Sequence, residues 1–246
     1  MSSPGTDAHA RPSTTGQRPV ALVTGATSGI GRAIVEDLAA DHRVLAVGRD
    51  PRALAQLGEL GEQVQPVRAE LTAVESLADL LEGVPRLDAL VHAAALGHRA
   101  TVESARPEDW RAQLELNVVV PAELTRVALP ALRAAQGTVV LLNSGAGFTA
   151  SPGNVIYAAT KFALRAFADS LRAEVEADGI RVASVHPGPT DTAMLRSIHE
   201  SIGQAHRPQE YIRAQSVASA VRGVLEASPD VQLTTVSVRP RREQTR

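Results

Sequence analysis

Residues 24–31, with the sequence Thr-Gly-Ala-Thr-Ser-Gly-Ile-Gly, constrain the fold of this chain more than any other stretch. A short apolar run precedes them at 20–23, and a helical pattern follows at 30–38. A strand that turns through glycines into a helix forms an anion site, because unpaired N–H groups at the helix start point at the turn. We expect Gly25 to let the turn reverse tightly, Gly29 to let a diphosphate approach, and Gly31 to bring helix and strand together. The spacing, Gly-x3-Gly-x-Gly, departs from the Gly-x-Gly-x2-Gly of many dinucleotide-binding folds.

Apolar runs typical of buried strands alternate with helical patterns along the chain. Continuous apolar runs favour parallel strands that are buried on both faces and joined by right-handed crossovers. Predicted strands occupy residues 20–23, 44–47, 64–67, 87–91, 137–142, 181–185 and 233–238, and predicted helices occupy 30–38, a segment from 51, 74–81, 107–132, 157–177 and 217–225. Pro121 is expected to kink the fourth of these helices, and residues 193–212 lack a strong period.

The pattern therefore predicts one doubly wound α/β domain: a seven-stranded parallel sheet with helices on both faces. Residues 1–18 are rich in Ser, Thr, Pro and Gly and are expected to form a disordered lead-in rather than a secretory signal. The domain is expected to cover 19–238, and residues 239–246 form a basic tail.

Composition limits the partners of such a domain. The formal net charge is −2, so nothing points to nucleic acid. No apolar run reaches the roughly 20 residues of a membrane helix, so no membrane association is expected. The chain has no cysteine, which excludes disulfides and fits a cytoplasmic location. His98, His199 and His206 are scattered along the sequence without clustered acids, so no metal site is expected.

Candidate functional residues follow the ends of the predicted strands. In doubly wound sheets, ligands bind beyond the carboxyl ends of the strands. Six residues fall at such ends and are expected to converge on one edge of the sheet: Gly25, Arg49, Glu70, Ala93, Ser144 and Pro187.

Tyr157 and Lys161 are four residues apart on a predicted helix, so their side chains share one face. An ammonium beside a phenol favours the phenolate, and a fall of about 3 units in the pKa of Tyr157 corresponds to about 4 kcal/mol. Tyr157 is then a credible general acid–base, although a Tyr-x3-Lys pair on its own also fits an ordinary surface pair. Ser144, at the end of the fifth strand, offers a hydroxyl to a substrate oxygen and lacks the Gly-x-Ser-x-Gly frame of a hydrolase. Asn117 lies inside a predicted helix, where asparagine is mildly unfavourable.

Together these residues resemble the short-chain dehydrogenase/reductase family in its single-domain form, across residues 19–238. The resemblance rests on Thr24-Gly25-x3-Gly29-x-Gly31, Asn117, Ser144, Tyr157-x3-Lys161 and Pro187-Gly188-x3-Thr192, in the order and spacing of the family. It implies a Rossmann-like fold and hydride transfer between a nicotinamide cofactor and a small carbonyl or alcohol substrate.

The resemblance also implies the role of each catalytic residue. Tyr157 would be the acid–base, Lys161 would lower its pKa and hold the nicotinamide ribose, and Ser144 would polarise the carbonyl. Asn117 would hold a water in a proton relay through Lys161. The remaining cofactor contacts would come from Gly25, Thr27, Ser28, Gly29, Ile30, Gly31, Arg49, Glu70, Leu71, Ala93, Ala94, Pro187, Gly188, Thr190 and Thr192, besides Tyr157 and Lys161 themselves.

The end of the second strand favours NADP(H) over NAD(H). An acid there would bind the ribose 2′-hydroxyl, but this chain has Gly48 followed by Arg49, whose guanidinium matches a phosphate. Asp50 partly offsets that charge, and Ser28 stands where many NADP-using relatives have a second basic residue.

Three positions depart from the family pattern. The usual Asn-Asn-Ala-Gly after the fourth strand is replaced by a segment that begins with His92, for which we expect a structural hydrogen-bonding role. Glu70 replaces an aspartate near the adenine, and Asn143 replaces a common second serine, which leaves Ser144 as the candidate hydroxyl.

The resulting prediction is an NADP(H)-dependent enzyme that interconverts a ketone and a secondary alcohol. The alternatives are a catalytically silent dinucleotide-binding sensor or scaffold and a 3-oxoacyl-thioester reductase. Relatives are commonly dimers or tetramers, and the apolar residues of the helix from Tyr157 exceed what one face needs, so a homodimer or homotetramer is expected. The substrate side is expected to be apolar, with Phe148, Val155, Met194, Leu195 and Ile198 as candidates.

Overall fold

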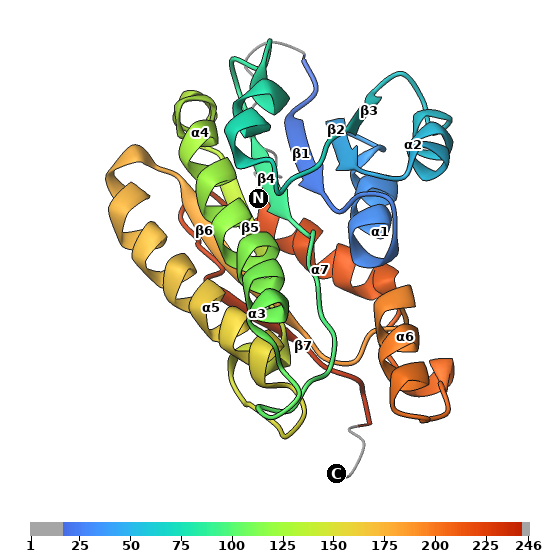
Figure 1. Cartoon of the computed structure of the whole chain (residues 1–246). Helices are drawn as coiled ribbons and strands as arrows, with labels where there is room; N and C mark the ends of the chain where they lie inside the picture. The colour runs from blue at the N-terminus through green and yellow to red at the C-terminus, as the bar shows by residue number, and fades with distance from the viewer. Residues whose placement is uncertain (1–16, 243–246) are drawn as a thin grey trace, which may run out of the picture.

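Seven parallel strands form the central sheet, in the order β3-β2-β1-β4-β5-β6-β7 (Figure 1). The computed structural model describes residues 17–242. The chain starts in the middle of the sheet and winds outward first to one edge and then to the other, which confirms the predicted doubly wound fold. The strands are β1 (Val20–Thr24), β2 (Arg43–Gly48), β3 (Val64–Arg68), β4 (Ala89–His92), β5 (Thr138–Leu142), β6 (Arg181–Pro187) and β7 (Thr235–Val238).

Helices cover both faces of the sheet, as predicted (Figure 1). One layer holds α1 (Gly29–Leu38), α2 (Pro51–Gly58) and α7 (Ala214–Leu225), and the other holds the 3-10 helix η1 (Val74–Leu81), α4 (Val120–Ala135) and α5 (Val155–Val175). Neighbouring strand residues alternate between the two cores: Val23 packs in the first and Leu22 in the second. Each fully buried aliphatic side chain contributes about 1.5–3 kcal/mol. On α5, Leu164 is buried and Phe162 stays exposed.

The predicted helix over 107–132 is divided into three segments. They are α3 (Pro107–Leu114), a π-helical turn (Glu115–Val119) and α4. Pro121 has no N–H to donate to the carbonyl of Asn117, four residues back, so a regular α-helical turn cannot be completed there. The irregular turn therefore precedes the proline, and it contains Asn117.

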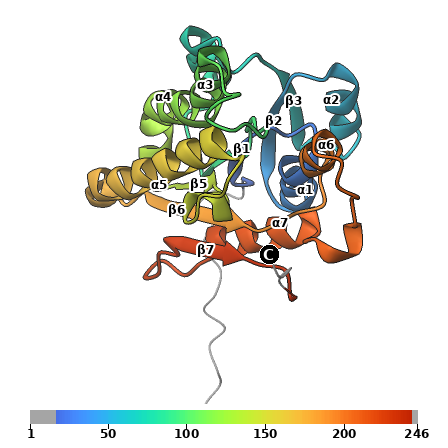
Figure 2. The same ribbon diagram turned by 60° about the horizontal axis from the view of Figure 1, so that its bottom comes forward.

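A helix that the sequence pattern did not predict follows β6. α6 (Ala193–Ser201) begins at Thr192, whose Oγ1 accepts a hydrogen bond from the N–H of Leu195 at 3.3 Å. Its one fully buried residue is His199, so it carries too few apolar residues to produce a periodic signal. α6 lies beyond the start of α1 at the carboxyl edge of the sheet (Figure 2), and a short 3-10 helix (Pro208–Glu210) follows it.

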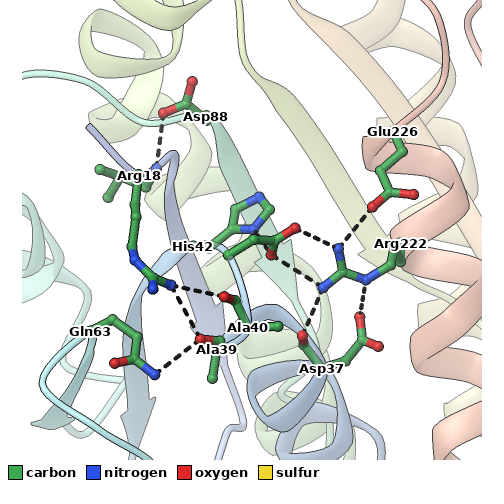
Figure 3. A network of polar contacts seen from close by, with 11 residues as sticks. Arg18, Asp37, Ala39, Ala40, His42, Gln63, Asp88, Arg222 and Glu226 are labelled. Carbon is green, nitrogen blue, oxygen red and sulfur yellow. Dashed lines mark hydrogen bonds and ion pairs between the residues drawn. The ribbon is translucent and has the colours of Figure 1, made fainter. Parts of the chain in front are cut away.

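Side chains from three other segments cap the end of α1, opposite the glycine turn (Figure 3). Arg18 donates to the carbonyl of Ala40 at 3.0 Å, Gln63 donates to that of Ala39 at 3.0 Å, and Arg222 of α7 donates to that of Asp37 at 2.7 Å. The last carbonyls of a helix have no partner within it, and nearby cations complement its dipole. This capping fixes the helix whose other end forms the glycine turn.

Arg222 also pairs with three carboxylates, at 2.6 Å from Asp37 of α1, 2.9 Å from Asp41 in the turn that follows α1, and 2.8 Å from Glu226 at the end of α7. Burial raises the pKa of Asp41, but hydrogen bonds from Arg222 and His42 outweigh it and hold that pKa below its ordinary value. Residues 1–16 of the predicted lead-in and residues 243–246 of the predicted tail lie outside the described residues. Within residues 17–242, no helix is long and apolar enough to cross a membrane.

Candidate active site

The glycine turn between β1 and α1 has the tight geometry that its sequence predicts. Gly25 and Gly29 have φ angles of +65° and +52°, a region that favours glycine. A Cβ on Gly25 would lie 2.7 Å from the backbone nitrogen of Ala94, and one on Gly31 would collide with the carbonyl oxygen of Gly25. The turn therefore packs directly against the segment after β4 and against the first turn of α1, as expected for Gly31.

The N-terminus of α1 carries no side-chain cap. Ser28 is the N-cap residue, yet its side chain accepts no capping hydrogen bond, and the first turn contains no acidic residue. The first N–H groups of a helix have no partner within it, and the helix dipole makes this end positive. The donor set at the turn therefore suits an anionic group such as a diphosphate.

A cavity of about 710 Å³ runs along the carboxyl edge of the sheet from this turn. Its lining brings together most of the predicted site residues: Gly25, Thr27, Ser28, Gly29, Ile30, Gly31, Arg49, Glu70, Leu71, Ala93, Ala94, Tyr157, Lys161 and Thr192. Asn117, Ser144, Pro187, Gly188 and Thr190 do not line it. Sequence reasoning missed Leu96, which follows β4 in a segment without a regular pattern. It also missed Arg111, Glu115 and Leu116, because the helical pattern of residues 107–132 did not indicate which face meets the cavity.

At the end of β2, the backbone leaves no room for a side chain on Gly48. A Cβ there would collide with the methyl group of Thr27. Arg49 follows, 74% exposed, and its Nη1 lies 3.3 Å from Oε2 of Glu70. The cation predicted for a phosphate and the acid predicted near adenine thus form an ion pair with each other.

Tyr157 and Lys161 lie together on α5, as their spacing predicts, but the electrostatics differ from the prediction. Lys161 is 2% exposed; its Nζ lies 5.5 Å from the centre of the Tyr157 ring and donates to the carbonyl of Leu142 at 2.8 Å. Burial lowers the pKa of Lys161 to about 8. Burial also raises the pKa of Tyr157, and a hydrogen bond with Ser144 reverses only part of that change. The expected lowering of the Tyr157 pKa by Lys161 is therefore not found in this structure, because burial outweighs a cation that points to a carbonyl.

Ser144 directly follows β5 and starts a short 3-10 turn (Gly145–Gly147). Its Oγ accepts a hydrogen bond from the N–H of Ala146 at 3.1 Å, which leaves the hydroxyl proton free to donate. Ser144 hydrogen-bonds to Tyr157, so the serine hydroxyl and the phenol lie side by side.

Asn117 uses its whole side-chain amide to hold neighbouring segments. Oδ1 accepts from the N–H of Leu96 at 2.8 Å, and Nδ2 donates to the carbonyl of Leu96 at 2.8 Å and to Oγ1 of Thr160 at 3.0 Å. Thr160 in turn donates to the carbonyl of Tyr157 at 2.8 Å. Asn117 therefore links the segment after β4 to the turn of α5 that carries Tyr157 and Lys161.

His92 is buried at the end of β4 and has the hydrogen-bonding position expected of it. Its Nε2 lies 2.9 Å from Oγ1 of Thr125 on α4, and its Nδ1 has no partner among the described residues. Because a buried N–H without an acceptor is costly, the neutral ring is expected to carry its proton on Nε2. Burial lowers the pKa of His92 to about 3.

This shift makes stability depend on pH through His92. A histidine whose folded pKa is lowered binds fewer protons when folded, so stability is lost as pH falls from the unfolded value near 6.5 towards 3. Between pH 7 and pH 5, we expect His92 to account for a loss of about 2 kcal/mol in the free energy of unfolding. Urea unfolding of the wild type and of His92→Gln at both pH values measures it. Equal losses in the two proteins would contradict the prediction.

Two of the histidines that are distant in the sequence meet at α6. His199 and His206 approach at 3.1 Å between their Nδ1 atoms, and Nε2 of His206 lies 2.8 Å from Asp191. Tyr211 packs on both rings. Among residues 17–242, no three His, Cys, Asp or Glu side chains are grouped as metal ligands would be. The cluster instead ties α6 to the segment that follows β6.

The cavity beside Tyr157 has an apolar wall. Leu96 and Met194 line it, and a Cβ on Gly97 would lie 3.0 Å from the Tyr157 ring. Met194 was expected here, whereas Leu96 was not. Phe148 instead stacks on His186 at 4.1 Å, and Val155 lines a second cavity of about 530 Å³, so neither belongs to this wall.

Comparisons with known proteins identify the family of this chain. A family model described as short chain dehydrogenase matches residues 19–203. An uncharacterized short-chain type dehydrogenase/reductase of Sinorhizobium fredii is 33% identical, over 90% of this chain and 91% of the relative. A solved short-chain dehydrogenase/reductase from Corynebacterium glutamicum is 42% identical, with a TM-score of 0.71, over 90% of this chain and all of that one. An alcohol dehydrogenase from Thermococcus sibiricus, solved with 5-hydroxy-NADP, has a TM-score of 0.83 and 25% identity over 93% of this chain and 99% of that one.

Proposed function

The chain belongs to the short-chain dehydrogenase/reductase family of oxidoreductases, and on this premise we propose that it is an NADPH-dependent reductase of small neutral ketones. One observation carries the proposal. Tyr157 and Lys161 line the same cavity as the uncapped glycine turn, and Ser144 hydrogen-bonds to Tyr157. An anion-binding turn and a proton donor that line one cavity suit hydride transfer from a dinucleotide to a carbonyl group.

Several features of the cavity fit a dinucleotide. The open N–H groups at the start of α1 suit its diphosphate, and Arg49 suits a ribose 2′-phosphate. An acidic residue at the position of Gly48 would repel that phosphate, but the structure leaves no room for a side chain there. Thr192, whose methyl carbon would lie 3.2 Å from a Cβ on Gly29, lines the cavity from the α6 side. The Thermococcus relative, solved with an NADP derivative, supports the same choice of dinucleotide.

The bound nicotinamide supplies the hydride, and the residues of this chain supply the proton and the charge. Tyr157 holds a proton at neutral pH, because burial raises its pKa, and it donates that proton to the carbonyl oxygen. Ser144 donates its free hydroxyl proton to the same oxygen as charge develops. Lys161 is a buried cation whose Nζ lies 5.5 Å from the centre of the Tyr157 ring.

The proton taken from Tyr157 has to be replaced. Since the Asn117 amide is fully engaged, the relay water would be held by the Asn117 backbone carbonyl, to which Pro121 cannot donate a hydrogen bond. The apolar wall formed by Leu96 and Met194 favours a neutral substrate over a charged one.

A panel of small neutral ketones tests the proposal through oxidation of NADPH and NADH. We expect turnover with NADPH and a kcat/KM ratio of NADPH to NADH above one. In Arg49→Ala, loss of a charged hydrogen bond should lower kcat/KM for NADPH by about 10- to 100-fold and leave that for NADH nearly unchanged.

Arg52→Ala is the matched control, because Arg52 is exposed and lies outside the cavity lining. A ratio below one in the wild type would reverse the choice of cofactor. The absence of turnover across the panel would overturn the proposed activity.

A further inference from the structure

Four residues, Asn143, Ser144, Ser184 and His186, form a closed ring of hydrogen bonds at the active site, and Asn143 lines the cavity. Nδ2 of Asn143 lies 3.3 Å from Oγ of Ser184, and this Oγ lies 2.9 Å from Nε2 of His186. Nδ1 of His186 lies 3.0 Å from the carbonyl oxygen of Ser144, and the N–H of Ser144 donates to Oδ1 of Asn143 at 2.9 Å. Asn143, Ser184 and His186 are at most 5% exposed. The ring thus holds both backbone polar groups of Ser144.

Chemistry fixes the direction of every bond in this ring. The Ser144 carbonyl can only accept, so Nδ1 of His186 must carry the proton. A neutral His186 then has Nε2 as an acceptor, which receives the hydroxyl proton of Ser184. The Oγ of Ser184 in turn accepts from the amide of Asn143, and the Oδ1 of Asn143 accepts from the N–H of Ser144. Each donor in these four hydrogen bonds therefore finds an acceptor only when His186 is neutral and carries its proton on Nδ1.

The ring also reaches the catalytic lysine. Nδ2 of Asn143 donates to the backbone carbonyl of Lys161 at 3.2 Å. Gly147 leaves room for this contact, because a Cβ there would lie 2.6 Å from Oδ1 of Asn143 and 3.0 Å from the Lys161 carbonyl. One amide therefore fixes the backbone of Ser144 relative to that of Lys161, although the two residues lie on different elements.

We propose that His186, acting through Ser184 and Asn143, is a positioning residue that holds the Ser144 hydroxyl in place for carbonyl reduction. The inference rests on the proposed function and goes beyond it, because it assigns a role to side chains that hold the backbone of Ser144 and do not bond to its hydroxyl. Displacing a catalytic group by about 1 Å lowers the rate on the order of 100-fold. The hydrogen bonds to the N–H and to the carbonyl of Ser144 are therefore expected to affect kcat more than cofactor binding.

Several charged groups face His186 and favour its neutral form. Burial lowers the pKa of His186, the nearby Arg165 and Lys161 lower it further, and the Ser144 carbonyl and Asp169 raise it only in part. Phe148 stacks on the ring at 4.1 Å and limits its rotation. The neutral ring required by the hydrogen bonds is thus also the one that the surroundings favour.

Matched variants test the positioning role with the ketone that the wild type turns over best. His186→Leu removes the hydrogen bonds of the imidazole to Ser184 and to the Ser144 carbonyl. It should lower kcat about 10- to 100-fold and keep the Kd of NADPH within about threefold of the wild-type value. His186→Asn keeps an N–H close to the Nδ1 position and should restore kcat to within about fivefold of the wild type. Ser184→Ala removes a single hydroxyl, a smaller change than His186→Leu, and should lower kcat about 3- to 10-fold. In the control Ser219→Ala, the lost hydroxyl donates only to Gln215 of its own helix among the described residues, so kcat should stay unchanged.

Unchanged kcat in both Ser184→Ala and His186→Leu would overturn the inference. A second measurement does not depend on turnover. In protein labelled with ¹⁵N-histidine, long-range ¹H–¹⁵N spectra should show His186 neutral with its proton on Nδ1, assigned by the signals lost in His186→Asn. A proton on Nε2 of His186, or a charged imidazole at pH 7, would overturn the proposed set of hydrogen bonds even if the enzyme is active. A wild type without ketone turnover, but with the Nδ1 tautomer, would refute the proposed function and the kinetic role together while leaving the ring intact.

Discussion

Replacement of Tyr157 by phenylalanine should lower kcat for ketone reduction by about 1,000-fold and leave the Kd of NADPH within about threefold. General acid–base groups contribute about 100- to 10,000-fold, and this variant removes the proton while keeping the ring. Because burial raises the pKa of Tyr157, the phenol should stay protonated across the neutral range. The loss should therefore be the same at pH 6 and at pH 8.

The chain provides a matched control, since Tyr211 is its other tyrosine. Tyr211 is buried beside His199, and it does not line the main cavity. Tyr211→Phe should keep kcat within about threefold of the wild type. Oxidation of NADPH at 340 nm gives both rates, and fluorescence titration gives the binding. Turnover in Tyr157→Phe within tenfold of the wild type would refute the acid–base role.

The parts of the site that are close together in sequence could be predicted from it. A strand, three glycines and a helix specify the turn at Gly25, because each step depends on neighbouring residues. Tyr157 and Lys161 share a face because they are one helical turn apart. The parallel sheet then brings the strand ends to one edge, so the sequence predicts that Arg49 and Glu70 lie near the cavity. It does not predict the ion pair between them.

Features that depend on burial or on distant contacts could not be predicted. The neighbour of Tyr157 is visible in the sequence, but the burial that raises its pKa is not. His199 and His206 meet only because the chain turns between α6 and the following 3-10 helix. Asn143 and Ser184 bond across 41 positions through the pairing of β5 with β6, so neither residue alone indicates a ring.

Replacement of Lys161 by methionine should separate activity from stability. We expect kcat/KM with NADPH to fall by about 100- to 1,000-fold, because the buried cation beside Tyr157 is lost. The free energy of unfolding at pH 7 should change by less than about 2 kcal/mol. Loss of the hydrogen bond to the Leu142 carbonyl costs about 1–3 kcal/mol, and removal of the charge relieves a desolvation cost of similar size. A folded but inactive variant is the expected result, and a change of more than about 4 kcal/mol would show that Lys161 mainly stabilises the fold.

The pKa of Lys161 can be measured without interference, because Lys161 is the only lysine of the chain. A protein labelled with ¹³C-lysine gives one side-chain signal, which we expect to titrate near pH 8 rather than near 10.5. A lysine with a lowered folded pKa is bound to fewer protons when folded, so the wild type should gain stability relative to Lys161→Met as pH rises from 8 to 10. Ketone reduction should decline over the same range, because the cation beside Tyr157 is lost. A titration near 10.5, with equal pH dependence of stability in the two proteins, would mean that the ammonium is solvated and does not lie buried against β5.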